Sequence, residues 1–363
     1  MTFQTGVTSA LGSKPAGSVL LLAPSNGLGG GIERYVQTLE WSFAHIGVGC
    51  HRLDLARAGV RSHLRMLADG RNVLRADPTR VRLVVGHRAL LPVATTLARE
   101  TNVHGISVLC HGSDAWGARM QVRRIIERRL MRRPDVRVVA ASSFTAGCLA
   151  GDCRATILPP GLSYEWFGTL SSASTTAVAD VQGIVVVTAF RLASWREKGL
   201  PQLFEALTAL GCPDIRLVVC GSGEAPPDLV EVVGMHEWCT LRVGLSDRDL
   251  ADQLASADLF VLATRTRPGR QASGEGFGLV LLEAQVAGTP VVVPAHGGSA
   301  DAYVDGITGL SPADENVETL TQLLGSALAD PGRLAWMGHR AAEWGREVFA
   351  PERYAELVAN RVL

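Results

Sequence analysis

The sequence predicts an α/β protein built from two Rossmann-like domains that face each other across a central cleft. Three observations lead to this prediction. Short apolar runs typical of buried parallel strands alternate with helical stretches. The alternation starts again near residue 181, and 363 residues are more than one ordinary core accommodates. Ligands of such sheets bind beyond the carboxyl ends of the strands, so we expect the functional site in the cleft.

The first half begins with an apolar run at residues 18–24, which indicates a strand covered on both faces. A glycine-rich turn follows, and apolar spacing then predicts a helix over about 32–46. Further strands are predicted at 82–86, 105–110 and 136–141. We assign residues 1–167 to this domain and expect residues 1–16 to be a disordered lead-in.

The second half repeats the pattern, with a predicted helix at 199–210. Its predicted strands are 181–188, 215–220, 241–243, 259–262 and 290–294. The segment 169–177 is rich in Ser and Thr, which favours a loop near the domain boundary. We assign residues 168–345 to this second domain.

Composition excludes several classes of protein. The formal net charge is zero, so no overall field favours nucleic acid. Seven scattered cysteines without a CxxC pair indicate reduced thiols, and no apolar run reaches the length of a membrane span. With no secretory signal at the start, we expect a cytoplasmic protein. Only two lysines, Lys14 and Lys198, occur among 35 basic residues, which draws attention to Lys198.

The most informative segment is the run from Glu275 to Glu283, which reads E-G-F-G-L-V-L-L-E. Gly276 and Gly278 let backbone amides approach a ligand closely, and the following apolar stretch predicts a buried helix. A carboxylate inside such a helix is costly unless it is paired. In a helix the two carboxylates would be about 12 Å apart along the axis, about the reach from a sugar across a diphosphate to a ribose.

Glu275 and Glu283 match the E-x7-E signature of family 4 of the retaining glycosyltransferases, the group 1 glycosyl transferases, which have the GT-B fold. The resemblance covers most of residues 18–360. It implies that Glu275 binds hydroxyls of the donor sugar and that Glu283 binds the ribose of the nucleotide. It also implies that the last helix, within 346–363, crosses back onto the first domain.

Arg191 and Lys198 lie in a segment that resembles the G-R-L…K-G motif of the family. Two cations aimed at one point would offset the charge of a diphosphate leaving group without a metal. Phe190 stands where the family usually has Gly, and the gap to Lys198 is about two residues longer than usual. Arg196 is therefore an alternative second cation.

Two first-domain motifs complete the resemblance. The glycines before Glu33 resemble the G-G-x-E segment, whose loop opens a helix and points amides at the cleft. His111 begins a segment similar to H-G-x-D, which implies that it contacts the donor sugar near the reacting carbon. Asp114 is alternatively a helix cap. The glycine-rich loop also leaves open an NAD-linked enzyme, with Asp54 as the acidic residue.

The resemblance therefore implies the following site. The catalytic residues are His111, Arg191, Lys198 and Glu275. The donor-binding residues are Gly29, Gly30, Gly221, Gly244, Phe277, Gly278, Leu279 and Glu283. The acceptor-binding residues are Glu33, Asp114 and Trp116.

We expect no metal and no cofactor. The DxD sequence at Asp247 to Asp249 is interpreted as the start of a helix capped by Ser246, and no His/Cys group has zinc spacing. The segment 119–133 carries seven arginines, with an apolar stripe of Ile125, Ile126, Leu130 and Met131. It is either a solvated helix or a peripheral contact with anionic lipid.

The resulting hypothesis is a metal-independent, retaining glycosyltransferase. Its donor would be a nucleoside-diphosphate sugar, with UDP favoured and GDP possible. Its acceptor would be a hydroxyl of a small molecule or natural product. The alternatives are transfer to a lipid-linked or cell-envelope acceptor at the membrane surface, and, in other classes, an NAD-linked enzyme or an inactive GT-B scaffold.

Overall fold

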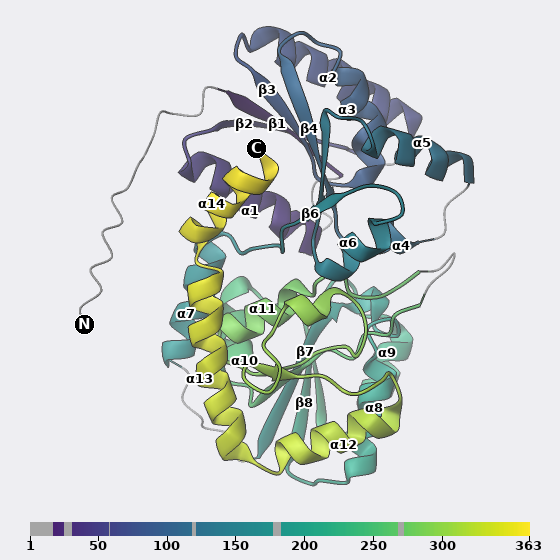
Figure 1. Cartoon of the computed structure of the whole chain (residues 1–363). Coiled ribbons are helices and arrows are strands. Elements are labelled where there is room, and N and C mark those ends of the chain that lie inside the picture. Colours follow the sequence, from purple (N-terminus) through teal and green to yellow (C-terminus); the bar gives the residue numbers. More distant parts are fainter. Residues whose placement is uncertain (1–16, 25–30, 58, 118–120, 177–182, 268–271) are drawn as a thin grey trace, which may run out of the picture.

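The computed structural model contains two α/β domains, one above the other (Figure 1). It describes residues 17–24, 31–57, 59–117, 121–176, 183–267 and 272–363. Each domain is built on a six-stranded sheet with helices on its faces. The predicted fold class is confirmed. Gly29, Gly30 and the expected lead-in 1–16 lie outside the described residues.

The first sheet has the order β2-β1-β3-β4-β5-β6, and all its pairs are parallel. The interior strand β1 is almost wholly buried, as its continuous apolar sequence requires. The strands are β1 (Ser18–Ala23), β2 (Gly49–Asp54), β3 (Val81–Val85), β4 (Val103–Cys110), β5 (Val136–Ala140) and β6 (Ala155–Ile157).

Helices cover both faces of the first sheet. Alternate residues of β1 enter different clusters: Leu20 and Leu22 pack with α2, α3 and α5, whereas Val19 and Leu21 pack with α1. The helices are α1 (Gly31–His45), α2 (Val60–Ala76), α3 (Leu91–Leu97), α4 (Ser113–Trp116), α5 (Gln121–Met131) and α6 (Ser143–Leu149), with a 3-10 turn η1 (Arg88–Leu90).

The second sheet has the order β12-β11-β10-β7-β8-β9 and is also parallel throughout. Its strands are β7 (Ile184–Arg191), β8 (Ile215–Ser222), β9 (Cys239–Val243), β10 (Leu259–Val261), β11 (Val291–Val292) and β12 (Gly309–Leu310). Its helices are α7 (Tyr164–Thr176), α8 (Leu200–Leu210), α9 (Pro227–Gly234), α10 (Asp247–Ala255), α11 (Leu279–Val286), α12 (Val317–Leu328) and α13 (Pro331–Val348), with 3-10 turns η2 (Leu192–Ser194) and η3 (Gly298–Asp301).

The Ser/Thr-rich segment 169–177 was expected to be a loop, and this expectation is wrong for residues 169–176. They form the second half of α7. The hydroxyls of Thr169 and Ser172 donate to backbone carbonyls of their own helix, at 2.9 Å each, so they do not compete with it. Leu170 and Ala173 are buried in the core of the second domain, and this packing holds the helix.

The last helix, α14 (Pro351–Val362), leaves α13 and lies on the first domain (Figure 1). Tyr354, Val358 and Val362 are buried in the cluster that contains α1. The Ser107 hydroxyl of β4 donates to the carbonyl of Val362 at 2.5 Å. The end of the described chain therefore completes the core of the first domain.

Candidate active site

The two domains touch where His111 meets the loop after Glu275. A Cβ added at Gly276 would lie 1.5 Å from the carbonyl oxygen of His111, and one at Gly298 would lie 1.9 Å from the carbonyl oxygen of Gly276. Only glycine permits these approaches. The backbone at Gly276, next to Glu275, is therefore in close contact with the backbone of His111 in the opposite domain.

Glu275 is paired with the lysine that the sequence singled out. The ammonium of Lys198 donates to Oε1 of Glu275, and the hydroxyl of Thr264 donates to the same oxygen at 3.1 Å. Glu275 is 8% exposed. The structure thus brings the carboxylate expected at the sugar and a cation expected at the diphosphate into one cluster.

Arg191 and Arg196 take different places. Arg191 is exposed at the carboxyl end of β7, as expected for a residue facing the cleft. Arg196 pairs with Asp228, and its guanidinium carbon lies 4.1 Å from the ring centroid of Trp195. Lys198, rather than Arg196, is therefore the cation that reaches Glu275.

Glu283 is buried in α11, with 7% of its side chain exposed. Its Oε1 accepts a hydrogen bond of 2.9 Å from the indole of Trp166 and lies 3.8 Å from Nε of Arg34. Burial raises the pKa of this carboxyl, while Arg34 and the Trp166 hydrogen bond act in the opposite direction. Trp166 and Arg34 were not found by sequence reasoning, because neither lies in a motif.

Asp247 and Asp249 have separate partners. Arg34 donates to Asp247 at 2.6 Å across the two domains. The backbone N–H of Asp249 donates to the hydroxyl of Ser246 at 3.1 Å, which caps α10. The interpretation of the DxD sequence as a helix start is confirmed.

His111 is held by its own motif. Its Nε2 lies 2.6 Å from the carbonyl oxygen of Gly86, so this nitrogen donates the ring hydrogen. The backbone N–H groups of His111 and Gly112 donate to Oδ1 of Asp114, at 3.0 and 2.7 Å. Asp114 lies in the first turn of α4 and holds the loop that precedes it. The alternative expectation, that it caps a helix from outside, is not met. Trp116 contacts the ring of Phe144, at a centroid distance of 5.1 Å.

The chain is similar to proteins of one family. The family described as Glycosyl transferases group 1 matches residues 180–344. A GDP-mannose-dependent alpha-(1-6)-phosphatidylinositol monomannoside mannosyltransferase of Mycolicibacterium smegmatis is 30% identical over 293 residues, which cover 76% of this chain and 75% of the relative. The chain belongs to the group 1 glycosyl transferases. The family resemblance seen in the sequence is confirmed.

Other comparisons agree with this glycosyltransferase assignment. A D-inositol 3-phosphate glycosyltransferase of Xylanimonas cellulosilytica is 31% identical over 204 residues, 52% of this chain and 47% of the relative. Among solved structures, Anabaena HepE in complex with UDP has a TM-score of 0.73 at 16% identity, over 94% of this chain and 98% of that one. The structural match shows the fold. The NAD-linked interpretation is replaced, and its acidic residue, Asp54, pairs with Arg52 at 2.7 Å.

The remaining residues expected at the donor differ in whether their side chain or only their backbone can reach it. Gly278 precedes α11 with φ at 86°, a conformation that favours glycine. The side chain of Phe277 is 3% exposed and packs near Phe349, with ring centroids 6.3 Å apart. Its side chain lies in the core, so only its backbone can face a donor. Leu279 packs against the same core. Of the other expected donor residues, Gly221 lies near the end of β8 and Gly244 follows β9. Glu33, which was expected at the acceptor, lies in the first turn of α1.

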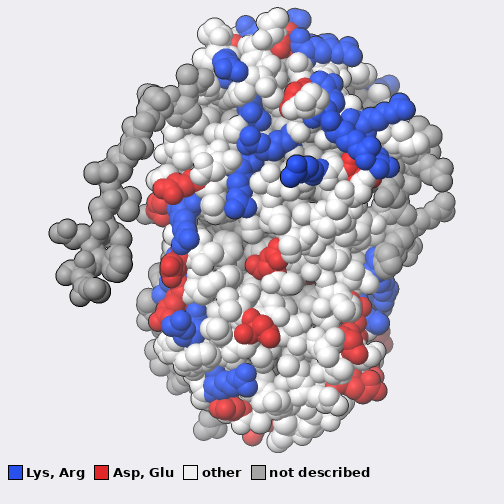
Figure 2. Space-filling view, viewed as in Figure 1, with Lys and Arg blue, Asp and Glu red and all other residues white. Residues whose placement is uncertain are grey.

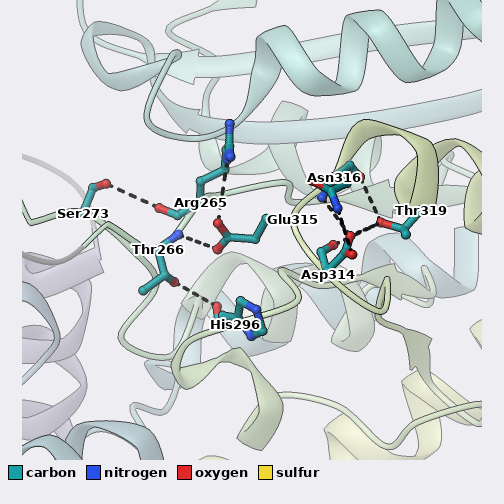
Figure 3. A network of polar contacts seen from close by, with 8 residues as sticks. All are labelled: Arg265, Thr266, Ser273, His296, Asp314, Glu315, Asn316 and Thr319. Carbon is teal, nitrogen blue, oxygen red and sulfur yellow. Dashed lines mark hydrogen bonds and ion pairs between the residues drawn. The ribbon is translucent and has the colours of Figure 1, made fainter.

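The segment leading to Glu275 is fixed by a polar network (Figure 3). The N–H of Thr266 donates to Glu315 at 2.7 Å, and its hydroxyl donates to the carbonyl of His296 at 3.2 Å. Nε of Arg265 lies 3.7 Å from the same carboxylate. Thr264, which donates to Glu275, precedes Arg265 and Thr266 in the chain. By binding these two residues, Glu315 helps to hold Thr264 in place.

Within the ranges given above, no group of three His, Cys, Asp or Glu side chains could hold a metal ion. In the same part of the chain, no helix is both long and apolar enough to cross a bilayer.

Proposed function

We propose that this glycosyltransferase moves mannose from GDP-mannose to a hydroxyl of an inositol phosphate head group on a lipid. The carrying observation is the 30% identity to a mannosyltransferase of that acceptor class over 75% of the relative's length. The lipid-linked acceptor, the alternative at the sequence level, takes precedence over the small-molecule acceptor. GDP likewise takes precedence over UDP as the base of the donor.

The Lys198–Glu275 ion pair supports a cluster in which the carboxylate binds the donor sugar and the ammonium binds the diphosphate. In the proposed complex, Glu275 accepts hydrogen bonds from hydroxyls of the donor sugar. Lys198 and Arg191 bind the diphosphate and stabilise its negative charge as the bond from the anomeric carbon breaks. Without the donor, the lysine and the glutamate neutralise each other, which keeps both charges in place in a partly buried site.

The chemical step that we propose keeps the configuration of the anomeric carbon. The bond from this carbon to the diphosphate oxygen breaks, and a bond to the acceptor oxygen forms on the same face. The acceptor proton passes to an oxygen of the departing diphosphate. His111, whose Nε2 donates to Gly86, presents its backbone and ring beside this centre. No metal is required in this scheme, because the two cations provide the charge.

An exposed surface of the first domain supports membrane contact. The side chains of Ile125 and Ile126 in α5 are 53% and 49% exposed, and Leu64 and Val60 in α2 are 59% and 75% exposed. Both helices begin at the carboxyl edge of the first sheet, the edge that carries His111. Arginine side chains gather over this region (Figure 2). We propose that it docks peripherally on anionic lipid at the cytoplasmic face.

The apolar stripe expected in α5 divides in two. Met131 is 3% exposed and belongs to the core, whereas Ile125 and Ile126 face outward. Glu127 points inward and pairs with the buried Arg88 at 3.0 Å. Arg128 donates to the carbonyl of Gly151 at 2.6 Å, so part of the arginine content has a structural role.

The function is tested by supplying GDP-mannose with phosphatidylinositol monomannoside in vesicles. We expect a mannosylated lipid whose new linkage has the α configuration by NMR. A free inositol phosphate is the second acceptor to test, because a D-inositol 3-phosphate glycosyltransferase is among the relatives. Absence of transfer to either acceptor from GDP-mannose and from UDP-hexoses would contradict the proposal.

Membrane docking is tested separately by co-sedimentation with vesicles of phosphatidylinositol and phosphatidylcholine. Ile125→Asp is expected to reduce binding at least several-fold, because it places a carboxylate at an anionic surface. Met235→Asp is the matched control, since Met235 is exposed but belongs to the second domain. Equal binding by the two variants would remove this surface from the proposal.

A further inference from the structure

Glu283 is gripped by side chains from two other helices. Trp166 comes from α7 and donates its indole N–H to Oε1 at 2.9 Å. Arg34 comes from α1, and its guanidinium carbon lies 4.4 Å from the centroid of the Trp166 ring. We propose that Trp166 is a positioning residue that aims the Glu283 carboxylate at the ribose of the donor. This inference rests on the ribose role of Glu283.

The immediate neighbours of Glu283 in its own helix are apolar, so they offer its carboxylate no side-chain hydrogen bond. Leu281, Leu282 and Ala284 are fully buried apolar neighbours in α11. A buried carboxylate needs hydrogen-bond donors, because water no longer solvates it. The contact with Arg34 is 3.8 Å, longer than a hydrogen bond. The Trp166 bond is therefore the directional contact that fixes how the carboxylate is rotated.

The contacts of the Glu283 carboxylate described above use one of its two oxygens. Both contacts, from Trp166 and from Arg34, use Oε1, so within the described chain Oε2 is the oxygen left for a diol. A cavity of about 240 Å³ is lined by the partners of this carboxylate, Arg34 and Trp166, and by Asp247, while Glu283 itself lies outside the lining. The two adjacent hydroxyls of a ribose are the kind of group that one carboxylate oxygen can accept from.

The indole is itself fixed across the domain boundary. Arg34, from the first domain, lies over its face and donates to Asp247 of the second domain at 2.6 Å. Trp166 is 4% exposed and packs in the core of the second domain. The ring is thus held by packing on one side and by a cation on the other. The N–H cannot turn away from Glu283 without breaking these contacts.

The variant that isolates the bond is Trp166→Phe, which keeps an aromatic ring beneath Arg34 and removes the N–H. Titration calorimetry would measure three ligands: GDP, its 2′,3′-dideoxy analogue and inorganic pyrophosphate. UDP and its analogue replace the GDP pair if UDP binds the wild type more tightly, since the ribose is common to both. We expect binding of the ribose-containing nucleotide to weaken about tenfold, the effect of losing a hydrogen bond to a charged group.

The other two ligands separate positioning from general damage. Binding of the dideoxy analogue and of pyrophosphate should change by less than about twofold, because neither carries the ribose hydroxyls. The donor KM should rise with the Kd, while kcat stays nearly constant. Trp344→Phe is the control: Trp344 packs against the same core and lies 5.4 Å from Phe349 by ring centroids. It should leave all three affinities unchanged.

Two results would overturn the inference. One is Trp166→Phe binding the nucleotide as tightly as the wild type while Glu283→Gln binds it weakly. The other is an equal loss for all three ligands, which would mean that Trp166 serves only the fold. If Glu283→Gln itself leaves nucleotide binding unchanged, the ribose role fails first, and the role of Trp166 falls with it.

Discussion

Gly276→Ala is the substitution for which the structure gives the clearest magnitude. The added Cβ would lie 1.5 Å from the carbonyl oxygen of His111, and real Cβ atoms essentially never come within 3.0 Å of such an atom. The difference, 3.0 − 1.5, means that the two loops must separate by about 1.5 Å. Both neighbours are backbone, so no side chain can turn aside to make room.

This separation falls between the His111 segment and the Glu275 segment, the two sides of the proposed reaction centre. A displacement of about 1 Å can cost about 10²-fold in rate when reacting groups are misplaced. We therefore expect kcat to fall by at least about 10²-fold, or about 2.7 kcal/mol in the activation barrier. The clash lies between domains, so each domain should still fold.

The assay is transfer from the donor, measured with circular dichroism and thermal unfolding of the same samples. Gly168→Ala is the matched control, because a Cβ at this exposed position of α7 would meet nothing within 4 Å. It should be active, and helix propensity should make it slightly more stable. If Gly276→Ala kept wild-type turnover, the close contact between the domains would not belong to the active state.

Three further predictions concern charge. Arg191→Ala should lower turnover by about 10²-fold or more, as for the loss of a charge-stabilising group, whereas Arg196→Ala, whose partner is Asp228, should retain most activity; equal effects would contradict the assignment. Burial raises the pKa of Glu283 above its ordinary 4.5, so this carboxyl stabilises the fold fully below about pH 4.5 and loses that contribution as pH rises through the raised pKa. The melting temperature of Glu283→Gln relative to the wild type should therefore increase as pH rises above this value, and a constant difference would refute the shift. Treatment with EDTA should leave transfer unchanged, and loss of activity restored by Mg²⁺ or Mn²⁺ would refute the metal-free scheme.

The parts of the fold that the sequence predicted are those set by local pattern. The apolar run 18–24 allowed only a buried strand, and β1 is one. The glycines around Glu275 indicated close backbone approach, although they did not reveal that the His111 carbonyl occupies the space. The sequence marked Glu283 as a buried carboxylate in need of a partner, but its partners come from α1 and α7.

The failures arise from contacts distant in sequence. The loop expected at 169–177 became α7 because tertiary packing outweighed composition. The additional residues between Arg191 and Lys198 form the 3-10 turn η2 and the buried Trp195. The N–H of Lys198 donates to the carbonyl of Ser194 at 2.9 Å. The sequence also could not show that the ring of Phe277, a residue predicted at the donor site, packs near Phe349, more than 70 residues away.

The position of α14 has a consequence for how the protein is made. Most of the first domain is translated before the second, but Tyr354, Val358 and Val362 of its core are translated after the second domain. Until then the nascent domain exposes the apolar side chains of α1 and β5 that these residues cover. Domains usually fold in order as they leave the ribosome, starting from the N-terminus. Here the first domain cannot complete its core until α14 has been made, after the second domain. A ribosome that stalls near residue 340 would therefore release a chain prone to aggregate.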